Sequence, residues 1–334
     1  MYSVPDLDEL KELIRLPVPR PLLLAGVGDR ELLRNRMKQG RWKRIMEEKL
    51  RQCDTALENP IPQLPRSLYD DYVRTGRRHP FEAPYFQRRR TAEDLALEKT
   101  EYLDRCRDYI YSIMEEFTWV IPAHVRDPFQ PGIVTLVDLF SSGTALLLAD
   151  LWDLLHEDLE PETLEWTRDS ILRRVLIPIR DHYDEQGWTE RYESNWCGVC
   201  CGNCGCALVL TALNEPWAVD LLHQLLRSID GFLATADPGG AWVEGVGYWF
   251  YGFSRVVFLA DLLAKVTEGR LDPLEDPRIE ATASFPVWTY MPPRSCVNFG
   301  DTSGTPSAYP EVLARFAERY RNPVIMWYIQ QLED

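Results

Sequence analysis

Apolar residues recur at spacings of three and four along most of the chain, the pattern of helices that bury one face. Residues 29–58 illustrate it with an apolar stripe made of Leu32, Leu33, Met37, Trp42, Ile45, Met46 and Leu50. The same criterion predicts helices over residues 91–120, 134–159, 161–186, 197–213, 216–236, 253–267 and 310–331. Strand patterns are sparse. The predicted fold class is therefore all-α, built from antiparallel helical hairpins.

Capping residues and prolines mark the predicted helix boundaries. Thr91 is a predicted N-cap because acidic residues follow it in the first turn. Pro161 suits a helix start. Pro178 predicts a kink or a break, because proline has no N–H to donate within a helix.

Some segments depart from the helical pattern and are predicted to be long loops. They are residues 59–86, rich in Pro and Arg, residues 236–252, rich in Gly and aromatics, and the irregular residues 281–306. The predicted organisation is one domain over residues 1–334, with an N-terminal extension at 1–19 and the long Pro/Arg-rich loop at 59–90. Long loops on a helical scaffold are common places for function.

Composition and charge narrow the class of protein. The chain has 45% hydrophobic residues and a formal net charge of −15, which indicates a sizeable core and argues against a nucleic-acid partner. It has no apolar run of membrane-spanning length and no signal-peptide pattern at its start, so we expect no membrane partner and a cytoplasmic location. The runs "RTGRR" and "QRRR" are local positive charge, suited to an anionic polymer or simply solvated.

Residues 197–206 contain five of the eight cysteines. The CxxC spacings within them are those of zinc or iron–sulfur ligands, and a redox role is also open. One helix, however, cannot arrange four thiolates tetrahedrally around an ion. The glycines at 198, 202 and 205 favour a closely packed helix in which Cys acts as a small hydrophobe.

Five segments, taken in order, resemble the heparinase II/III-like polysaccharide lyases. They are "RPLLLAGVGDRELLRNRM", "FTWVIPAH" with "VDLFSSGTALLLADLWDLL", "SNWCGVCCGNCGCALVLTAL", "PGGAWVEGVGYWFYGFSRVVFLADLL" and "CVNFGDTSG". The resemblance covers roughly residues 20–327. It implies an (α/α) toroid, which in that family is followed by a β-sandwich domain that contributes an active-site His. The chain ends about where the toroid would end, so the resemblance leaves open whether it is catalytically complete.

The resemblance also implies a chemistry and a partner. Such lyases cleave uronic-acid glycans by β-elimination, need no cofactor, and act on an anionic polysaccharide or oligosaccharide. Relatives are often periplasmic or secreted, and a homo-oligomer is possible. Cys stands where the family has Asn, Gly and Ala on a packed helix at the floor of a cleft, so we expect no metal site here.

The resemblance assigns candidate catalytic residues. Asn195 matches the position that neutralises the substrate carboxylate, although Asn and Ser at a helix start also serve as N-caps. Tyr248 is the preferred base and acid, because it follows the Gly245-x-Gly247 turn, and Tyr251 is the alternative. Both tyrosines could instead be packing residues. His124, in a loop beside Pro122, is the best catalytic candidate among the histidines.

Further residues near these motifs are candidate substrate contacts. They are Arg191, Trp196, Glu244, Trp249, Asn298 and Asp301. Salt bridges, core packing and turn formation are the structural alternatives for the same residues.

The sequence thus leaves several functions open. The chain is a polysaccharide lyase, a carbohydrate-binding or scaffold toroid without catalysis, or a metal or redox protein built on the cysteines. A glycoside hydrolase is the weakest alternative, because no convincing pair of carboxylates is present.

Overall fold

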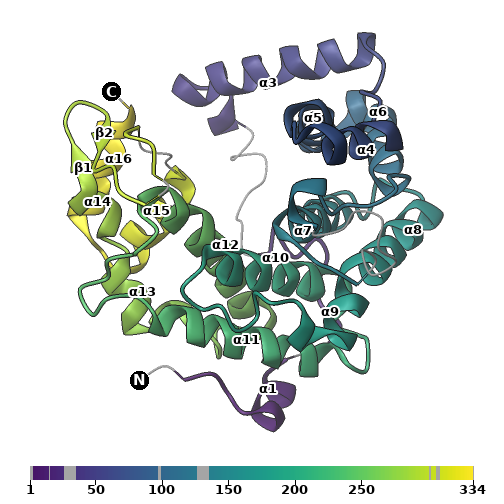
Figure 1. The fold of residues 1–334 in the computed structure, drawn as a ribbon. Helices are drawn as coiled ribbons and strands as arrows, with labels where there is room; N and C mark the ends of the chain where they lie inside the picture. The colour runs from purple at the N-terminus through teal and green to yellow at the C-terminus, as the bar shows by residue number, and fades with distance from the viewer. Residues whose placement is uncertain are drawn as a thin grey trace. The chain divides into compact units, whose positions relative to one another are not determined.

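The computed structural model describes residues 3–14, 16–25, 35–96, 99–125, 135–300, 302–305 and 309–333. Helices dominate these residues, and the strands among them form one hairpin with two residues on each side (Figure 1). The all-α fold class is therefore confirmed. None of the described helices combines the length and apolarity needed to cross a membrane.

The contacts of the chain divide it into two compact units. Unit 1 comprises Met1–Pro17, His182–Val209 and Leu213–Asp334. Unit 2 comprises Val18–Asp181 and Leu210–Ala212. The expectation of one toroidal domain remains a prediction.

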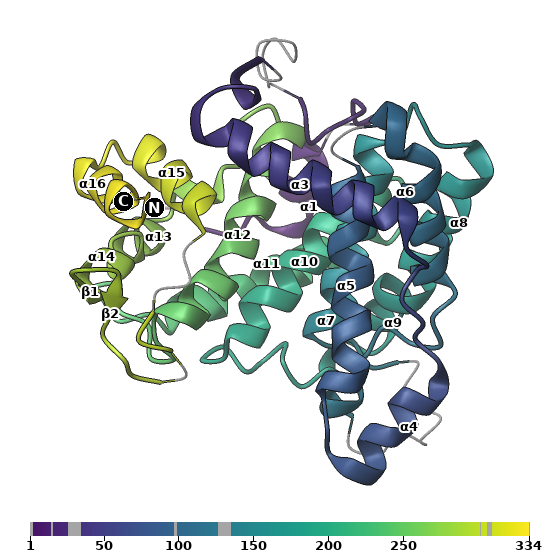
Figure 2. The same ribbon diagram turned by 90° about the horizontal axis from the view of Figure 1, so that it is seen from above.

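Unit 2 is an assembly of helices and short turns. They are α3 (Gly40–Glu58), α4 (Arg66–Thr75), α5 (His79–Leu95), α6 (Lys99–Met114), η1 (Pro122–His124), α7 (Leu139–Leu154), α8 (Pro161–Ile171), η3 (Leu172–Leu176) and α9 (Ile177–Asp181). Helix α5 packs along α6 and also contacts α3 and α7 (Figure 2). A capping box formed by Asp138 and Ser141 starts α7.

The prolines of unit 2 act where the sequence predicted. Pro161 is the first residue of α8. The helix then continues as a π turn over Leu172–Leu176, and α9 begins at Ile177. Pro178 cannot donate an i→i−4 hydrogen bond, and its ring would clash with the carbonyl of Arg174, so the regular ladder is interrupted just before it. The helix runs on through Pro178 within α9, so the predicted kink or break takes the form of a π turn before the proline.

The predicted loop at residues 59–90 is wrong, because α4 and most of α5 lie within it. Pro80 is tolerated in the first turn of α5, where N–H groups have no intrahelical acceptor. The buried face of α5 consists of Phe81, Tyr85, Arg88, Arg89, Ala92, Asp94 and Leu95. Thr91 lies inside α5, so its predicted N-cap role is also wrong.

Unit 1 contains the remaining elements, except for the last two residues of α10. They are α1 (Leu7–Leu13), η4 (Tyr183–Glu185), α10 (Asn195–Thr211), α11 (Ala218–Ala234), α12 (Val246–Val266), η5 (Pro273–Glu275), α13 (Pro277–Thr282), α14 (Phe285–Thr289), β1 (Tyr290–Met291), β2 (Ser295–Cys296), α15 (Pro310–Arg319) and α16 (Pro323–Glu333). The predicted N-terminal extension includes α1, which packs on α11. The helix predicted over residues 310–331 is divided between α15 and α16 by Arg321, which has a left-handed φ of 48°, and by Pro323.

Helix α10 is a closely packed core helix, as the glycine pattern predicted. A Cβ on Gly202 would lie 2.6 Å from the backbone carbon of Arg255 in α12, and one on Gly198 would lie 2.8 Å from the Phe232 ring in α11. The eight cysteines of the chain are buried thiols. Burial raises the pKa of Cys204 and, together with a hydrogen bond to Cys197, that of Cys201. The described residues contain no cluster of His, Cys, Asp and Glu suited to a metal ion.

Candidate functional site

Asn195 and Glu244 are joined by a pair of hydrogen bonds. The backbone N–H of Asn195 donates to Glu244 Oε2 at 2.6 Å, and its side-chain Nδ2 donates to Oε1 at 3.1 Å. Asn195 is the first residue of α10, and Glu244 lies just before α12. Two segments that the resemblance named separately are therefore in direct contact within unit 1.

The N-cap of α10 is Ser194, whose Oγ accepts the N–H of Trp196 at 3.3 Å. The capping role considered for Asn195 is therefore taken by its neighbour. Glu244 lies at the same helix end, where the first N–H groups have no intrahelical acceptor and the helix dipole favours negative charge. The protein's own carboxylate binds Asn195, the residue at which the resemblance implies a substrate carboxylate.

The side-chain oxygen of Asn195 has no hydrogen-bond partner among the described residues, although the residue is only 4% exposed. The amide must point its Nδ2 towards Glu244, because the reverse orientation would set two acceptor oxygens against each other. Asn195 Oδ1 is therefore a buried acceptor that lacks a donor. Such an atom costs free energy unless water or a ligand hydroxyl supplies the bond.

The fifth segment of the resemblance, "CVNFGDTSG", packs on the Gly245–Gly247 turn. Gly247 N donates to Thr302 Oγ1 at 3.2 Å. Gly245 has φ 90°, and a Cβ there would lie 2.2 Å from Thr302 Oγ1. Gly300 has φ 61°, and its Cβ would lie 2.4 Å from the carbonyl oxygen of Glu244. Both glycines are needed for the two loops to approach, and this approach fixes the backbone on either side of Glu244.

The two candidate tyrosines lie on one side of α12. Helix α12 begins at Val246, before Tyr248 and seven residues earlier than the sequence predicted. Tyr248 and Tyr251 are three residues apart, so they are neighbours along the helix surface, and both are half-buried. The structure does not separate them as candidates for the base.

Trp249 points into the core instead. It is fully buried, and its Nε1 donates to Thr282 Oγ1 at 2.7 Å. Its ring stacks on Phe253 with the centroids 5.4 Å apart. The predicted substrate contact is therefore wrong for Trp249, which packs the far side of the helix that carries the tyrosines.

The other predicted contacts in unit 1 are at or near the surface. Arg191 and Asn298 are exposed, and Trp196 is half-buried in the first turn of α10. Arg191 belongs to the turn that leads into the Ser194 cap, because Ser194 N donates to its carbonyl at 3.1 Å. Asp301 lies outside the described residues.

His124 belongs to unit 2, where its ring is held on two sides. Its Nδ1 lies 2.8 Å from Asp138 Oδ2, and the ring stacks on Phe140 with the centroids 5.2 Å apart. Asp138 also caps α7. His124 is thus a well-oriented imidazole next to a buried carboxylate, an arrangement used both in structural pairs and in proton transfer.

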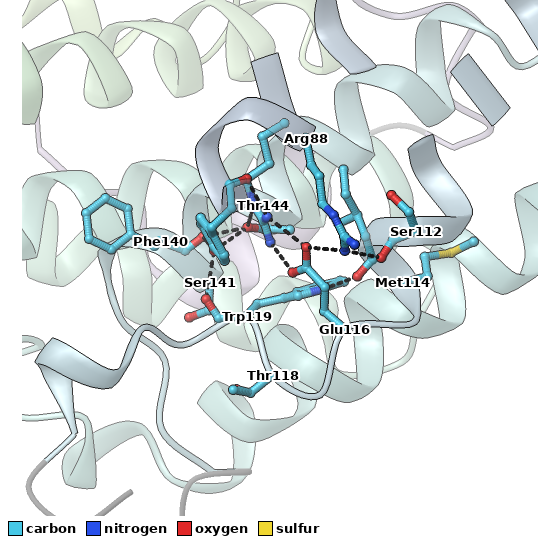
Figure 3. Close-up of polar contacts among 12 residues, drawn as sticks. Arg88, Ser112, Met114, Glu116, Thr118, Trp119, Phe140, Ser141 and Thr144 are labelled. Atoms are coloured by element: carbon cyan, nitrogen blue, oxygen red, sulfur yellow. Dashed lines mark hydrogen bonds and ion pairs between the residues drawn. The ribbon is translucent and has the colours of Figure 1, made fainter. Parts of the chain in front are cut away.

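Sequence reasoning missed two features. One is a cleft of about 1070 Å³ in unit 1, lined among others by Tyr183, His223, Arg227 and Arg278. The other is a buried cluster in unit 2 around Arg88, Arg89 and Glu116 (Figure 3). The sequence leaves the run "QRRR" as either a contact for an anionic polymer or solvated charge. Helical spacing with Tyr85, Ala92 and Leu95 was the signal that two of its arginines face inward.

Comparison with models of known protein families found no match, and no curated protein matched the chain. Any functional assignment therefore rests on the residues and geometry of the protein itself.

Proposed function

We propose that unit 1 binds an acidic glycan and cleaves it by β-elimination beside the N-terminal ends of α10 and α12. The observation that carries the proposal is the contact between Asn195 and Glu244, with Tyr248 and Tyr251 beginning one turn beyond Glu244. We also propose that the helices form the (α/α) toroid that the resemblance implies.

β-Elimination makes defined demands on these residues. A base removes the proton on C5 of the uronate, a C4=C5 double bond forms as the C4–O4 bond breaks, and O4 takes up a proton. The uronate carboxylate must be hydrogen-bonded so that the enolate-like intermediate is stabilised. In this proposal Tyr248 is the base and the proton donor to O4, and Tyr251 is the alternative.

Asn195 has capacity left for substrate. Nδ2 carries a second N–H besides the one given to Glu244, and Oδ1 needs a donor. A uronate carboxylate can accept a hydrogen bond from this second N–H, and a sugar hydroxyl can donate one to Oδ1. Glu244 is then a positioning residue that fixes the rotamer of Asn195. Arg191, exposed in the preceding turn, is the proposed cationic contact for the polymer.

A second candidate function is glycan binding without cleavage. The carboxylate of Glu244 favours this alternative. It already accepts hydrogen bonds from the backbone N–H and the side-chain Nδ2 of Asn195. Its negative charge also opposes the binding of a second carboxylate there. Carbohydrate would then be held at the same surface with no elimination.

The test is ultraviolet absorbance of the full chain incubated with heparin, heparan sulfate, chondroitin, alginate and polyglucuronate. Elimination produces an absorbing unsaturated uronate. We expect the signal to be lost in Tyr248→Phe or Tyr251→Phe and kept in Tyr72→Phe, a half-buried tyrosine of unit 2.

Other outcomes are equally informative. Glycan binding measured by calorimetry, with no absorbance change, would favour the second candidate. New reducing ends without absorbance would mean hydrolysis and would contradict both.

A further inference from the structure

Two arginines of α5 share one buried carboxylate in unit 2. Arg89 makes a paired contact with Glu116, Nη1 to Oε1 at 3.1 Å and Nη2 to Oε2 at 2.7 Å. Arg88 Nη1 reaches Oε1 of the same carboxylate at 3.3 Å. Figure 3 shows Arg88, Glu116 and the carbonyl of Ser112 converging at this point. The Glu116 side chain is only 1% exposed.

A third arginine also belongs to this cluster. A third guanidinium, that of Arg174, donates to the carbonyl of Glu116 at 2.9 Å. Burial lowers the pKa of Arg174, and the charge of Arg89 lowers it further, against the raising effect of Glu116. Arg174 is half-buried, so its charge is partly solvated. The edge of the Arg88 guanidinium that does not contact Glu116 is left to bind another acceptor.

Arg88 connects the cluster to a groove at the surface of unit 2. It lines a groove of about 550 Å³ between the segment that precedes α4 and the end of α6. Its side chain is 9% exposed, Nε donates to the carbonyl of Pro62 at 2.7 Å, and Nη1 donates to the carbonyl of Ser112 at 3.0 Å. Nη2 has no hydrogen-bond partner among the described residues.

The groove also has an apolar wall. Ile61, Leu64 and Pro65 line it together with Phe117, a phenylalanine that is 58% exposed. The guanidinium carbon of Arg66 lies 4.0 Å from the centroid of the Phe117 ring. An exposed aromatic ring beside two arginines presents both an apolar surface and a carboxylate-binding fork.

We propose that this groove binds an organic monocarboxylate with an apolar body, its carboxylate on Arg88 Nη2 and its body against Phe117 and Leu64. Asp108 and Glu115 also line the groove. Their charges oppose phosphate, sulfate and other multiply charged anions more strongly than a single carboxylate. The inference concerns unit 2 alone and does not depend on the function proposed for unit 1.

The test is calorimetric titration of the full chain with 4-phenylbutyrate, with 4-phenylbutyramide and sodium sulfate as comparison probes. We expect the acid to bind and the uncharged amide to bind at least roughly tenfold more weakly, because hydrogen bonds to charged groups are the stronger ones. Sulfate should bind more weakly than the acid.

Two variants and one control locate the site. Arg88→Lys keeps a positive charge but removes the planar fork, and we expect about a tenfold loss of affinity for phenylbutyrate. Phe117→Ser removes an exposed ring, so it should fold normally and still bind the acid several-fold more weakly. Leu57→Ser, at an exposed leucine of α3, should bind as the unaltered protein does.

The proposal is overturned by any of three results. They are no binding of phenylbutyrate by the unaltered protein, equal binding of acid and amide, and unchanged affinity in Phe117→Ser. Unchanged affinity in Phe117→Ser would overturn the proposal even if the Arg88→Lys variant does not fold.

Discussion

Glu244 accepts hydrogen bonds from both the backbone N–H and the side-chain amide of Asn195, at 2.6 and 3.1 Å. One carboxylate thereby links the start of α10 to the loop that leads into α12, across 49 positions of sequence. The link also fixes the rotamer of the asparagine on which the proposed elimination depends.

The first prediction concerns this link. Glu244→Ala leaves the donors of Asn195 without their acceptor, so we expect a loss of about 1–3 kcal/mol in the free energy of unfolding. Urea denaturation measures it. Glu193→Ala, at an exposed glutamate close to the same helix start, is the matched control and should change stability by less than about 0.5 kcal/mol. Equal stability of the two variants would show that the Asn195–Glu244 pair contributes nothing.

The second prediction concerns helix packing in unit 1. Gly202→Ala would place a methyl group 2.6 Å from the backbone of Arg255, where no side chain can move aside. We expect a loss of about 3 kcal/mol or more, seen as a lower melting temperature. Gly304→Ala is the control, because no atom lies within 4 Å of its added Cβ. A Gly202→Ala protein as stable as the control would contradict the close approach of α10 and α12.

The third prediction concerns the buried charges of unit 2. Glu116→Gln keeps the shape of the side chain but leaves Arg88 and Arg89 without a countercharge, and we expect a loss of about 3–5 kcal/mol. Glu115→Gln changes the same residue type one position earlier, at an exposed site, and should be close to neutral. Chemical denaturation of both variants under the same conditions gives the comparison. If Glu116→Gln lowered the free energy of unfolding no more than Glu115→Gln does, the buried cluster would have to be well solvated.

The fourth prediction concerns pH and the thiols. Burial raises the pKa of Cys106 to about 12 and also raises the pKa of Cys204. In the unfolded chain a cysteine thiol has a pKa of about 8.5. Above that pH the thiols ionise in the unfolded protein but stay protonated in the folded protein. The unfolded state then binds fewer protons than the folded state above that pH. Stability from this source is therefore complete below about pH 8.5 and falls as pH rises further.

Two measurements check this. The urea midpoint should decrease between about pH 8 and pH 10, and less so in Cys204→Ala relative to its own value at neutral pH. A thiol reagent should label the native protein slowly at about pH 8 and label all cysteines in urea. Rapid labelling of the native cluster would mean that α10 opens readily, against the packing described above.

Local sequence pattern determined the fold class, some helix boundaries and one packed helix of this protein. The three- and four-residue spacing of apolar positions gave the all-α class. The start of α8 at Pro161 and the π turn before Pro178 follow from the missing N–H of proline. The glycines between the cysteines indicated a packed helix, because only a residue without Cβ permits the approach seen at Gly202. These properties depend on neighbours within one or two helical turns, so they can be read from sequence.

Tertiary structure decided what local pattern leaves open. Ser194 and Asn195 are both good capping residues, and only the position of Glu244 directs Asn195 away from the cap. Trp249 and Tyr248 are adjacent, yet the indole bonds Thr282 in the core while the phenol stays half-exposed. Arg88 and Arg89 can be buried because Glu116 forms hydrogen-bonded ion pairs with both. Each outcome depends on a partner 27 or more positions away. Local periodicity can direct a side chain inward, as at Arg88 and Arg89, but it does not identify that partner.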